Sequence, residues 1–234
     1  MASDMNLHGF GPQLLAGAIV TLQLAMAALC VGLVLGILGA LSKSSSVTPL
    51  RMLGNGYTTI IRGIPELLVV LVVYFGSSGA LTAIAALFGH DEFVELDPFT
   101  AGTLALGLTF GAYATEVFRG ALLTIPAGHI EAAQSLGLGR WRIFVRVILP
   151  QLWRIALPGL GNLFLVLLKD TSLISVIGLD ELMRKSQIGT GFSKEPFTFF
   201  GVAALIYLGM TVITNGILIL MERHANRGYR RAGT

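Results

Sequence analysis

Long runs of apolar residues alternate with short charged segments along this chain. Five such runs stand out, at about 14–41, 67–75, 99–118, 155–177 and 197–221, and the second could extend from 57 to 87. A helix needs about 20 apolar residues to cross a bilayer, and it satisfies its own backbone hydrogen bonds there. The pattern therefore predicts an all-α polytopic membrane protein with about five transmembrane helices, built as a single transmembrane domain over 1–234.

The basic residues are distributed unevenly between the two predicted sides of the membrane. If the N-terminus lies outside, twelve of the sixteen Lys and Arg residues fall in inside segments: Lys43, Arg51, Arg62, Arg119, Arg140, Arg142, Arg146, Arg154, Arg223, Arg227, Arg230 and Arg231. The outside segments hold Arg184, Lys185 and Lys194. Because cytoplasmic loops carry the excess of basic residues, the distribution predicts an N-out, C-in topology.

The composition agrees with a membrane protein and excludes several other classes. Hydrophobic residues make up 54% of the chain and charged residues 12%, and the mean hydropathy is +0.77. A net charge of +3 could suggest a nucleic-acid partner, but the basic residues follow membrane sidedness, so we expect membrane lipid and no nucleic acid. The single cysteine, Cys30, lies in an apolar run, so we expect neither a disulfide framework nor a metal site.

Two pairs of glycines have the spacing of close helix crossings. Gly32 and Gly36 form a GxxxG motif in the first run, and Gly107 and Gly111 form another in the third. Small residues let two helix backbones approach in lipid, where van der Waals contact has to replace the hydrophobic drive. These glycines are therefore candidates for helix contacts.

The inside segment 119–157 is long enough to have a structure of its own. Residues 131–136 favour a helix, Gly137 and Gly139 break it, and an amphipathic stretch follows that Pro150 is expected to close. The pattern predicts two short helices around a glycine hinge on the cytoplasmic face. Such a unit could lie on the membrane or dock on a soluble partner, and periodicity does not choose between them.

The string Glu131-Ala132-Ala133, followed by Gly137 and then by 147–150, resembles the EAA loop of ABC importer permeases. Val147 stands where the family prefers Ile, which is a conservative departure. The resemblance implies that this loop is the coupling helix that docks on a cytoplasmic ATPase. The residues implied in coupling are Gly128, Glu131, Ala132, Ala133, Gly137, Arg140 and Arg142.

The resemblance extends over nearly the whole chain. Segments 62–66, 111–120 and 168–173 resemble the polar amino-acid subfamily, and within it the permeases for histidine, lysine, arginine, ornithine and octopine-type opines. This implies a type I ABC importer permease in the bacterial inner membrane, which imports basic amino acids or opines by alternating access. The implied partners are two copies of an ABC ATPase, a second permease (identical or homologous), and a periplasmic or lipid-anchored binding protein.

The absence of a phosphate-loop motif from this sequence agrees with a separate ATPase partner. The motif GxxxxGK[ST] does not occur in the sequence. We therefore expect that ATP and Mg bind to the partner ATPase, that this chain itself carries no cofactor, and that it is not an enzyme.

Ionisable residues inside apolar runs are the candidates for substrate contact. A charge in the bilayer centre costs roughly 2.5–3.5 kcal/mol on insertion scales, so such residues usually face the interior of a bundle. Lys169 and Asp170 are adjacent, and therefore point about 100° apart on a regular helix. If the helix breaks at this point, a half-helix beginning near Asp170 could offer backbone N–H groups to a substrate carboxylate. The candidate substrate-binding residues are Arg62, Glu66, Glu116, Lys169, Asp170, Thr171 and Ser172.

Other interpretations remain open at this point. Glu66 follows Pro65 and could simply be a favourable acid in a first helical turn, and Glu116 could pair with Arg119. A secondary transporter or channel without ATP coupling would use the same charges but leave the EAA-like loop unexplained. An assembly subunit would use them only to tie helices together.

Overall fold

The computed structural model describes residues 7, 9–87 and 96–227 of the chain. Helices account for most of these residues, and the described ranges contain no strand. The elements are α1 (Gly11–Lys43), α2 (Thr48–Gly63), α3 (Glu66–Leu87), α4 (Pro98–Thr124), α5 (Ala127–Ser135), α6 (Arg140–Ile143), the π-helix η1 (Phe144–Ile148), α7 (Leu149–Asp170), the 3-10 helix η2 (Thr171–Ile177), α8 (Leu182–Ser193) and α9 (Pro196–Ala225). The predicted all-α class is confirmed.

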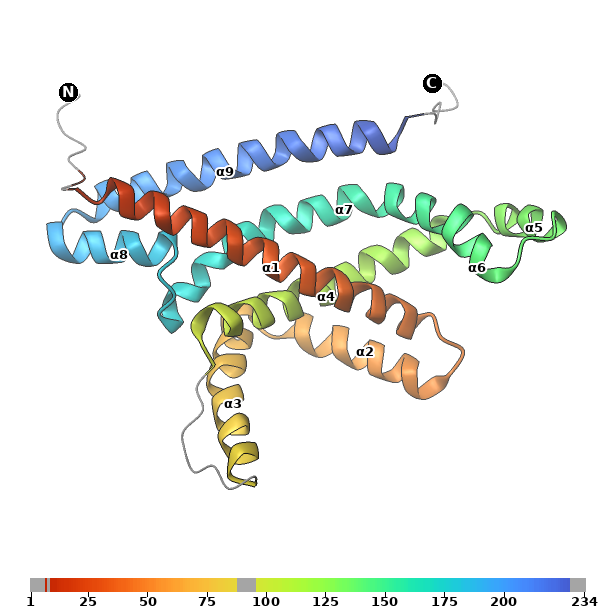
Figure 1. Cartoon of the computed structure of the whole chain (residues 1–234), viewed down its shortest axis with the longest axis horizontal. Coiled ribbons are helices and arrows are strands. Elements are labelled where there is room, and N and C mark those ends of the chain that lie inside the picture. The colour runs from red at the N-terminus through yellow and green to blue at the C-terminus, as the bar shows by residue number, and fades with distance from the viewer. Residues whose placement is uncertain (1–6, 8, 88–95, 228–234) are drawn as a thin grey trace.

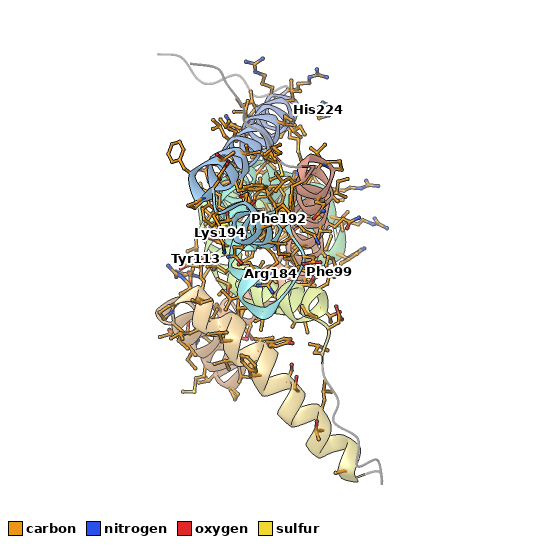
Figure 2. All side chains as sticks on the ribbon, turned by 90° about the vertical axis from the view of Figure 1, so that its left-hand side faces the viewer. Phe99, Tyr113, Arg184, Phe192, Lys194 and His224 are labelled. Atoms are coloured by element: carbon orange, nitrogen blue, oxygen red, sulfur yellow. The ribbon has the colours of Figure 1, made fainter. Side chains whose placement is uncertain are left out.

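The long helices α1, α4, α7 and α9 run roughly along the long axis of the molecule (Figure 1). Helix α4 lies at the centre, in contact with α1, α3 and α7, and the main core cluster follows its length. Helix α8 lies at one end beside the starts of α1 and α9, while α5 and α6 lie at the other end (Figure 1). Figure 2 views the molecule from the α8 end, where Arg184, Phe192 and Lys194 lie.

Segments that were predicted to lie on opposite sides of the membrane lie at opposite ends of the molecule. The α5 and α6 helices lie at the end opposite α8, which carries Arg184 and Lys185 (Figure 1). By length and composition, three helical segments could cross a membrane: Gly11–Lys43, Arg140–Ile177 and Pro196–Ala225. The bent pair of α2 and α3 brings the number to four. Five spans and the N-out, C-in orientation stay predictions.

The two GxxxG motifs, each predicted as a candidate for a helix contact, meet at one crossing between α1 and α4. A Cβ added to Gly32 would lie 3.1 Å from the backbone oxygen of Gly107, and a Cβ on Gly111 would lie 3.2 Å from the oxygen of Gly32. The four glycines thus let α1 and α4 pack backbone to backbone, and this is the most extensive helix contact in the described chain.

The segment predicted to act in coupling contains a short helix, α5, followed by a glycine hinge, as predicted, but no second short helix. The turn between α5 and α6 contains Gly137 with φ +73°, a left-handed conformation that suits glycine. The expectation that Pro150 closes the second helix is wrong. The chain passes from α6 through η1 into α7, and Pro150 lies in the first turn of α7, where its missing N–H is tolerated.

Helices α2 and α3 form an elbow with a bend of 109° at Ile64-Pro65. Pro65 cannot donate a hydrogen bond, and the residue before a proline prefers the extended conformation, which Ile64 adopts at φ −107° and ψ 137°. Beyond the elbow, α3 extends away from the other helices in both views (Figures 1 and 2). It continues to Leu87, and residues 88–95 lie outside the described part of the chain.

Candidate functional site

An acidic pocket of about 280 Å³ lies where the elbow meets α4 and α7. Glu66 enters it from the first residue of α3 and Asp170 from the last residue of α7, and the two side chains interact directly. Thr109 and Tyr113 of α4 contribute further polar groups, and the rest of the wall is apolar. The sequence predicted both carboxylates but not that they would share a pocket.

Asp170 is the last residue of the regular α-helix α7. The chain continues as the 3-10 helix η2, in which Asp170 makes no side-chain cap. The hydroxyl groups of Thr171 and Ser172 donate to the carbonyl oxygens of Leu168 and Lys169 instead of capping a new helix. The expected half-helix with free N–H groups is therefore wrong, and the wholly buried Thr171 does not line the pocket.

Lys169 points away from the acidic pocket. It lines a separate pocket of about 260 Å³ with Ser172, Met183 and Tyr207. The expected angular separation of Lys169 and Asp170 is thus observed, because the helix is still regular through these two residues. Lys169 and Ser172 are therefore not brought together with Glu66 and Asp170.

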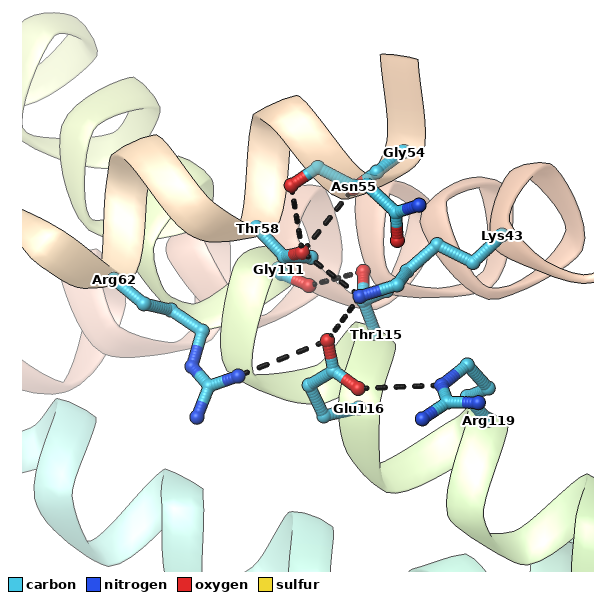
Figure 3. Close-up of polar contacts among 9 residues, drawn as sticks. All are labelled: Lys43, Gly54, Asn55, Thr58, Arg62, Gly111, Thr115, Glu116 and Arg119. Carbon is cyan, nitrogen blue, oxygen red and sulfur yellow. Dashed lines mark hydrogen bonds and ion pairs between the residues drawn. The ribbon is translucent and has the colours of Figure 1, made fainter. Parts of the chain in front are cut away.

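A cluster of basic groups surrounds Glu116 one turn farther along α4 (Figure 3). Its carboxylate accepts a hydrogen bond from Lys43 Nζ, lies 3.7 Å from Arg62 Nη1, and accepts from Arg119 Nε at 3.3 Å. Lys43 also donates to the hydroxyl of Thr58 at 2.9 Å. The predicted Glu116–Arg119 pair is confirmed, and the structure adds Arg62 and Lys43, so that α1, α2 and α4 are tied together by one carboxylate.

Tyr113 lies between the acidic pocket and this basic cluster. Its side chain lines the acidic pocket, and it also lines a second pocket of about 320 Å³ with Lys43, Arg62 and Glu116. The guanidinium carbon of Arg62 lies 5.2 Å from the centroid of the Tyr113 ring, which is a cation–π contact. Sequence reasoning missed the role of Tyr113. The signal that could have found it is its place one turn before Glu116 on the same face of a helix.

The residues predicted to act in coupling lie at the molecular surface, apart from one. Ala133 is buried, whereas Gly128, Glu131, Ala132, Gly137, Arg140 and Arg142 are exposed. Two large apolar side chains beside them, Leu136 and Trp141, are 81% and 75% exposed. This exposed mixture of apolar and charged groups is suited to contact with another protein.

Sequence reasoning also missed Glu181, which is wholly buried between α1, α8 and α9. Its carboxylate caps α8 by accepting from the N–H groups of Met183 at 2.9 Å and Arg184 at 2.7 Å. It also accepts from Tyr207 at 3.1 Å and from Thr21 at 3.3 Å. Burial raises the pKa of Glu181, and these four hydrogen bonds oppose the rise.

Comparisons with known proteins agree over almost the full length. The family model described as "Binding-protein-dependent transport system inner membrane component" matches residues 32–227. A nopaline transport system permease protein of Agrobacterium fabrum is 46% identical over 223 residues, covering 95% of this chain and 94% of that protein. The histidine/lysine/arginine/ornithine transport system permease protein of Salmonella typhimurium is 41% identical over 226 residues, covering 97% of this chain and 99% of that protein.

The same comparison holds in three dimensions. A crystal structure of an amino acid ABC transporter with histidines contains a chain that superimposes with a TM-score of 0.80 at 33% identity. The alignment covers 96% of the present chain and 100% of that chain.

Proposed function

Because the chain belongs to the family of binding-protein-dependent transport system inner membrane components, and is the permease component of an amino acid ABC transporter, we propose that it imports amino acids or opines with a cationic side chain. Arginine, lysine, histidine, ornithine and the opines are the proposed substrates. The observation that carries this proposal is the acidic pocket with Glu66 and Asp170. Relatives named for histidine, lysine, arginine and ornithine transport and for nopaline transport support it.

The charges of the pocket give the physical reason for a cationic ligand. Glu66 and Asp170 bring two carboxyl groups together in a largely apolar wall, where ionisation of both is unfavourable. Each carboxylate raises the energy of the other, and a bound ammonium or guanidinium group relieves this repulsion while forming charge-assisted hydrogen bonds. A guanidinium group with five N–H donors can serve two carboxylates at once.

Permeases of this family work with an ATPase and a substrate-binding protein. For this chain we propose two ABC ATPase subunits, which bind the ATP and Mg, a second permease and an external binding protein. The exposed groups of α5 and its neighbours, including Glu131, support docking of the ATPase at this end. Closure of the ATPases would move α5 and open the pocket inward. Uptake that continued without nucleotide hydrolysis would instead favour a secondary transporter or channel.

Substitution of the two carboxylates tests the substrate assignment. We expect Glu66→Gln and Asp170→Asn each to weaken arginine and lysine binding by about 10- to 100-fold, because each removes a hydrogen bond to a charged partner. The measurement is equilibrium binding of radiolabelled substrate to the purified transporter, together with uptake in proteoliposomes. Asp180→Asn is the matched control, since that carboxylate is 60% exposed and contacts Lys185 at the α8 end. Normal transport of both substrates by both variants would contradict the assignment.

A further inference from the structure

The elbow between α2 and α3 carries two opposite charges that enter adjoining pockets. Arg62 lies at the end of α2 and lines the basic pocket, while Glu66 begins α3 and lines the acidic pocket. Tyr113 forms part of the wall of both. We propose that Arg62 is a specificity-determining residue that binds a carboxylate of the substrate, while Glu66 and Asp170 bind its cationic group.

The charge balance of the basic pocket leaves room for an added anion. Lys43 and Arg62 line this pocket with two positive charges, and Glu116 lines it with one negative charge, which leaves an excess of one. Arg119 pairs with the same carboxylate but does not line the pocket. The acidic pocket is the opposite case, since two carboxyl groups and no basic side chain line it. A molecule with a cationic group and a carboxylate at separate positions therefore matches the two pockets in sign.

Arg62 is the cation of the cluster that is best placed to take the anion. Lys43 is committed to Thr58 and Glu116, and its side chain is only 12% exposed. The guanidinium of Arg62 approaches Glu116 only to 3.7 Å, which is longer than a hydrogen bond, and its side chain is 43% exposed. It therefore keeps N–H donors available for a planar carboxylate, which a guanidinium can bind through two parallel hydrogen bonds.

The Tyr113 ring keeps Arg62 beside the acidic pocket. The cation–π contact holds the guanidinium near a face of the ring, whose side chain also lines the acidic pocket. The bend at Ile64-Pro65 separates Arg62 from Glu66 and sends the two side chains to different pockets. The arrangement would thus bind both the carboxylate and the cationic group of a substrate, and it would bind a solute that has only the cationic group more weakly.

This inference rests on the proposed function, and a comparison of arginine with agmatine separates the two. Agmatine is arginine without its carboxylate, so it carries one more net positive charge. An acidic pocket acting alone would bind agmatine at least as tightly as arginine. With the Arg62 subsite, we expect the purified permease–ATPase complex, without the binding protein, to bind arginine about tenfold more tightly or better, the value of one charged hydrogen-bonded pair.

The variants test Arg62 directly. We expect Arg62→Gln to weaken arginine binding by about tenfold or more and to leave agmatine binding unchanged or stronger, so that the preference disappears. Arg119→Gln is the matched control. Arg119 also pairs with Glu116, and its side chain is 42% exposed, but it does not line the basic pocket. The control should keep the preference for arginine.

Each outcome of these measurements decides something. Equal binding of arginine and agmatine by the unchanged complex overturns the subsite and leaves the proposed function intact, whereas binding of neither overturns both. A preference that survives Arg62→Gln, or that is lost equally in Arg119→Gln, also overturns the subsite. If Arg62→Gln does not assemble, Arg62→Lys keeps the charge but not the planar fork, and it should lower the preference without abolishing arginine binding.

Discussion

Truncation of Glu181 should destabilise the transporter more than any other single carboxylate change at the α8 end. Glu181→Ala removes the cap of α8, worth about 1 kcal/mol, and leaves the partly buried Tyr207 hydroxyl without the acceptor that it has at 3.1 Å, a loss of about 1–3 kcal/mol. The free-energy cost at Thr21 is smaller, because its hydroxyl also donates to the carbonyl oxygen of Gly17 at 3.0 Å. The sum is a loss of about 2–4 kcal/mol.

The assay is thermal unfolding of the detergent-solubilised transporter, followed by tryptophan fluorescence or by loss of the monodisperse species. For a domain of this size, a loss of 2–4 kcal/mol corresponds to a fall in Tm of roughly 4–15 °C. The neighbouring Asp180→Ala is the matched control, because its 60% exposed carboxylate makes a surface ion pair with Lys185 that contributes at most about 1 kcal/mol. Equal effects of the two substitutions would refute the reasoning.

The same residue gives a prediction about pH. Since burial raises the pKa of Glu181 above its ordinary value of 4.5, the folded state holds this proton more tightly than the unfolded state does. Its contribution to stability is therefore fully present below the unfolded pKa and is lost as the pH rises through the folded pKa. Glu181→Gln retains acceptor capacity without the ionisation, so the Tm difference between Gln and wild type should shift in favour of Gln as the pH rises from about 4.5. A difference that is constant with pH would contradict this.

Two further predictions concern the helix crossing and the coupling segment. Gly32→Val should lower the Tm by several degrees because even a Cβ would lie 2.5 Å from Phe110 Cδ1, and overpacking costs about 1–3 kcal/mol. Gly209→Val, where nothing lies within 4 Å, should not lower it, and equal losses would exclude the crossing as the cause. Glu131→Lys should reduce substrate-stimulated ATP hydrolysis without a change in Tm, because Glu131 is exposed on α5. The same change at Glu222 in the last turns of α9 should preserve ATP hydrolysis, and an unaltered Glu131→Lys transporter would argue against α5 as the docking element.

The features that sequence analysis predicted well depend on local spacing. Apolar runs, the glycine pairs and the hinge at Gly137 each follow from residues close together in the chain, and the structure contains all of them. The first turn of α3 at Glu66 follows likewise from Pro65. Such features need only the period of a helix and the conformational limits of Gly and Pro.

The features that it missed depend on pairs distant in the sequence. Glu66 and Asp170 share a pocket only because α3 starts beside the end of α7, and Lys43 meets Glu116 only because α1 crosses α4. Glu181 gave no local signal beyond an acid before a helix, since its partner Tyr207 lies on α9. Local periodicity carries no information about such tertiary pairs. The half-helix predicted at Asp170 was wrong because a local signal was misleading. Thr171 and Ser172 are residue types suited to capping, but their hydroxyl groups donate to preceding carbonyl oxygens instead.

The segment predicted to act in coupling lies in the chain between the two helices that line most of the acidic pocket. Two residues separate the end of α4 from the start of α5, and α6 continues through η1 into α7, so the segment joins the two helices that supply the long walls of the pocket. A displacement at α5 would therefore change how α4 lies against α7, and with it the distance between Tyr113 and Asp170. Bending is easiest at two places, the π-helical turn η1 that precedes α7 and Pro158 within α7. A push at the exposed α5 surface would then be taken up by α7, while α4, held to α1 by the glycine crossing, stays in place.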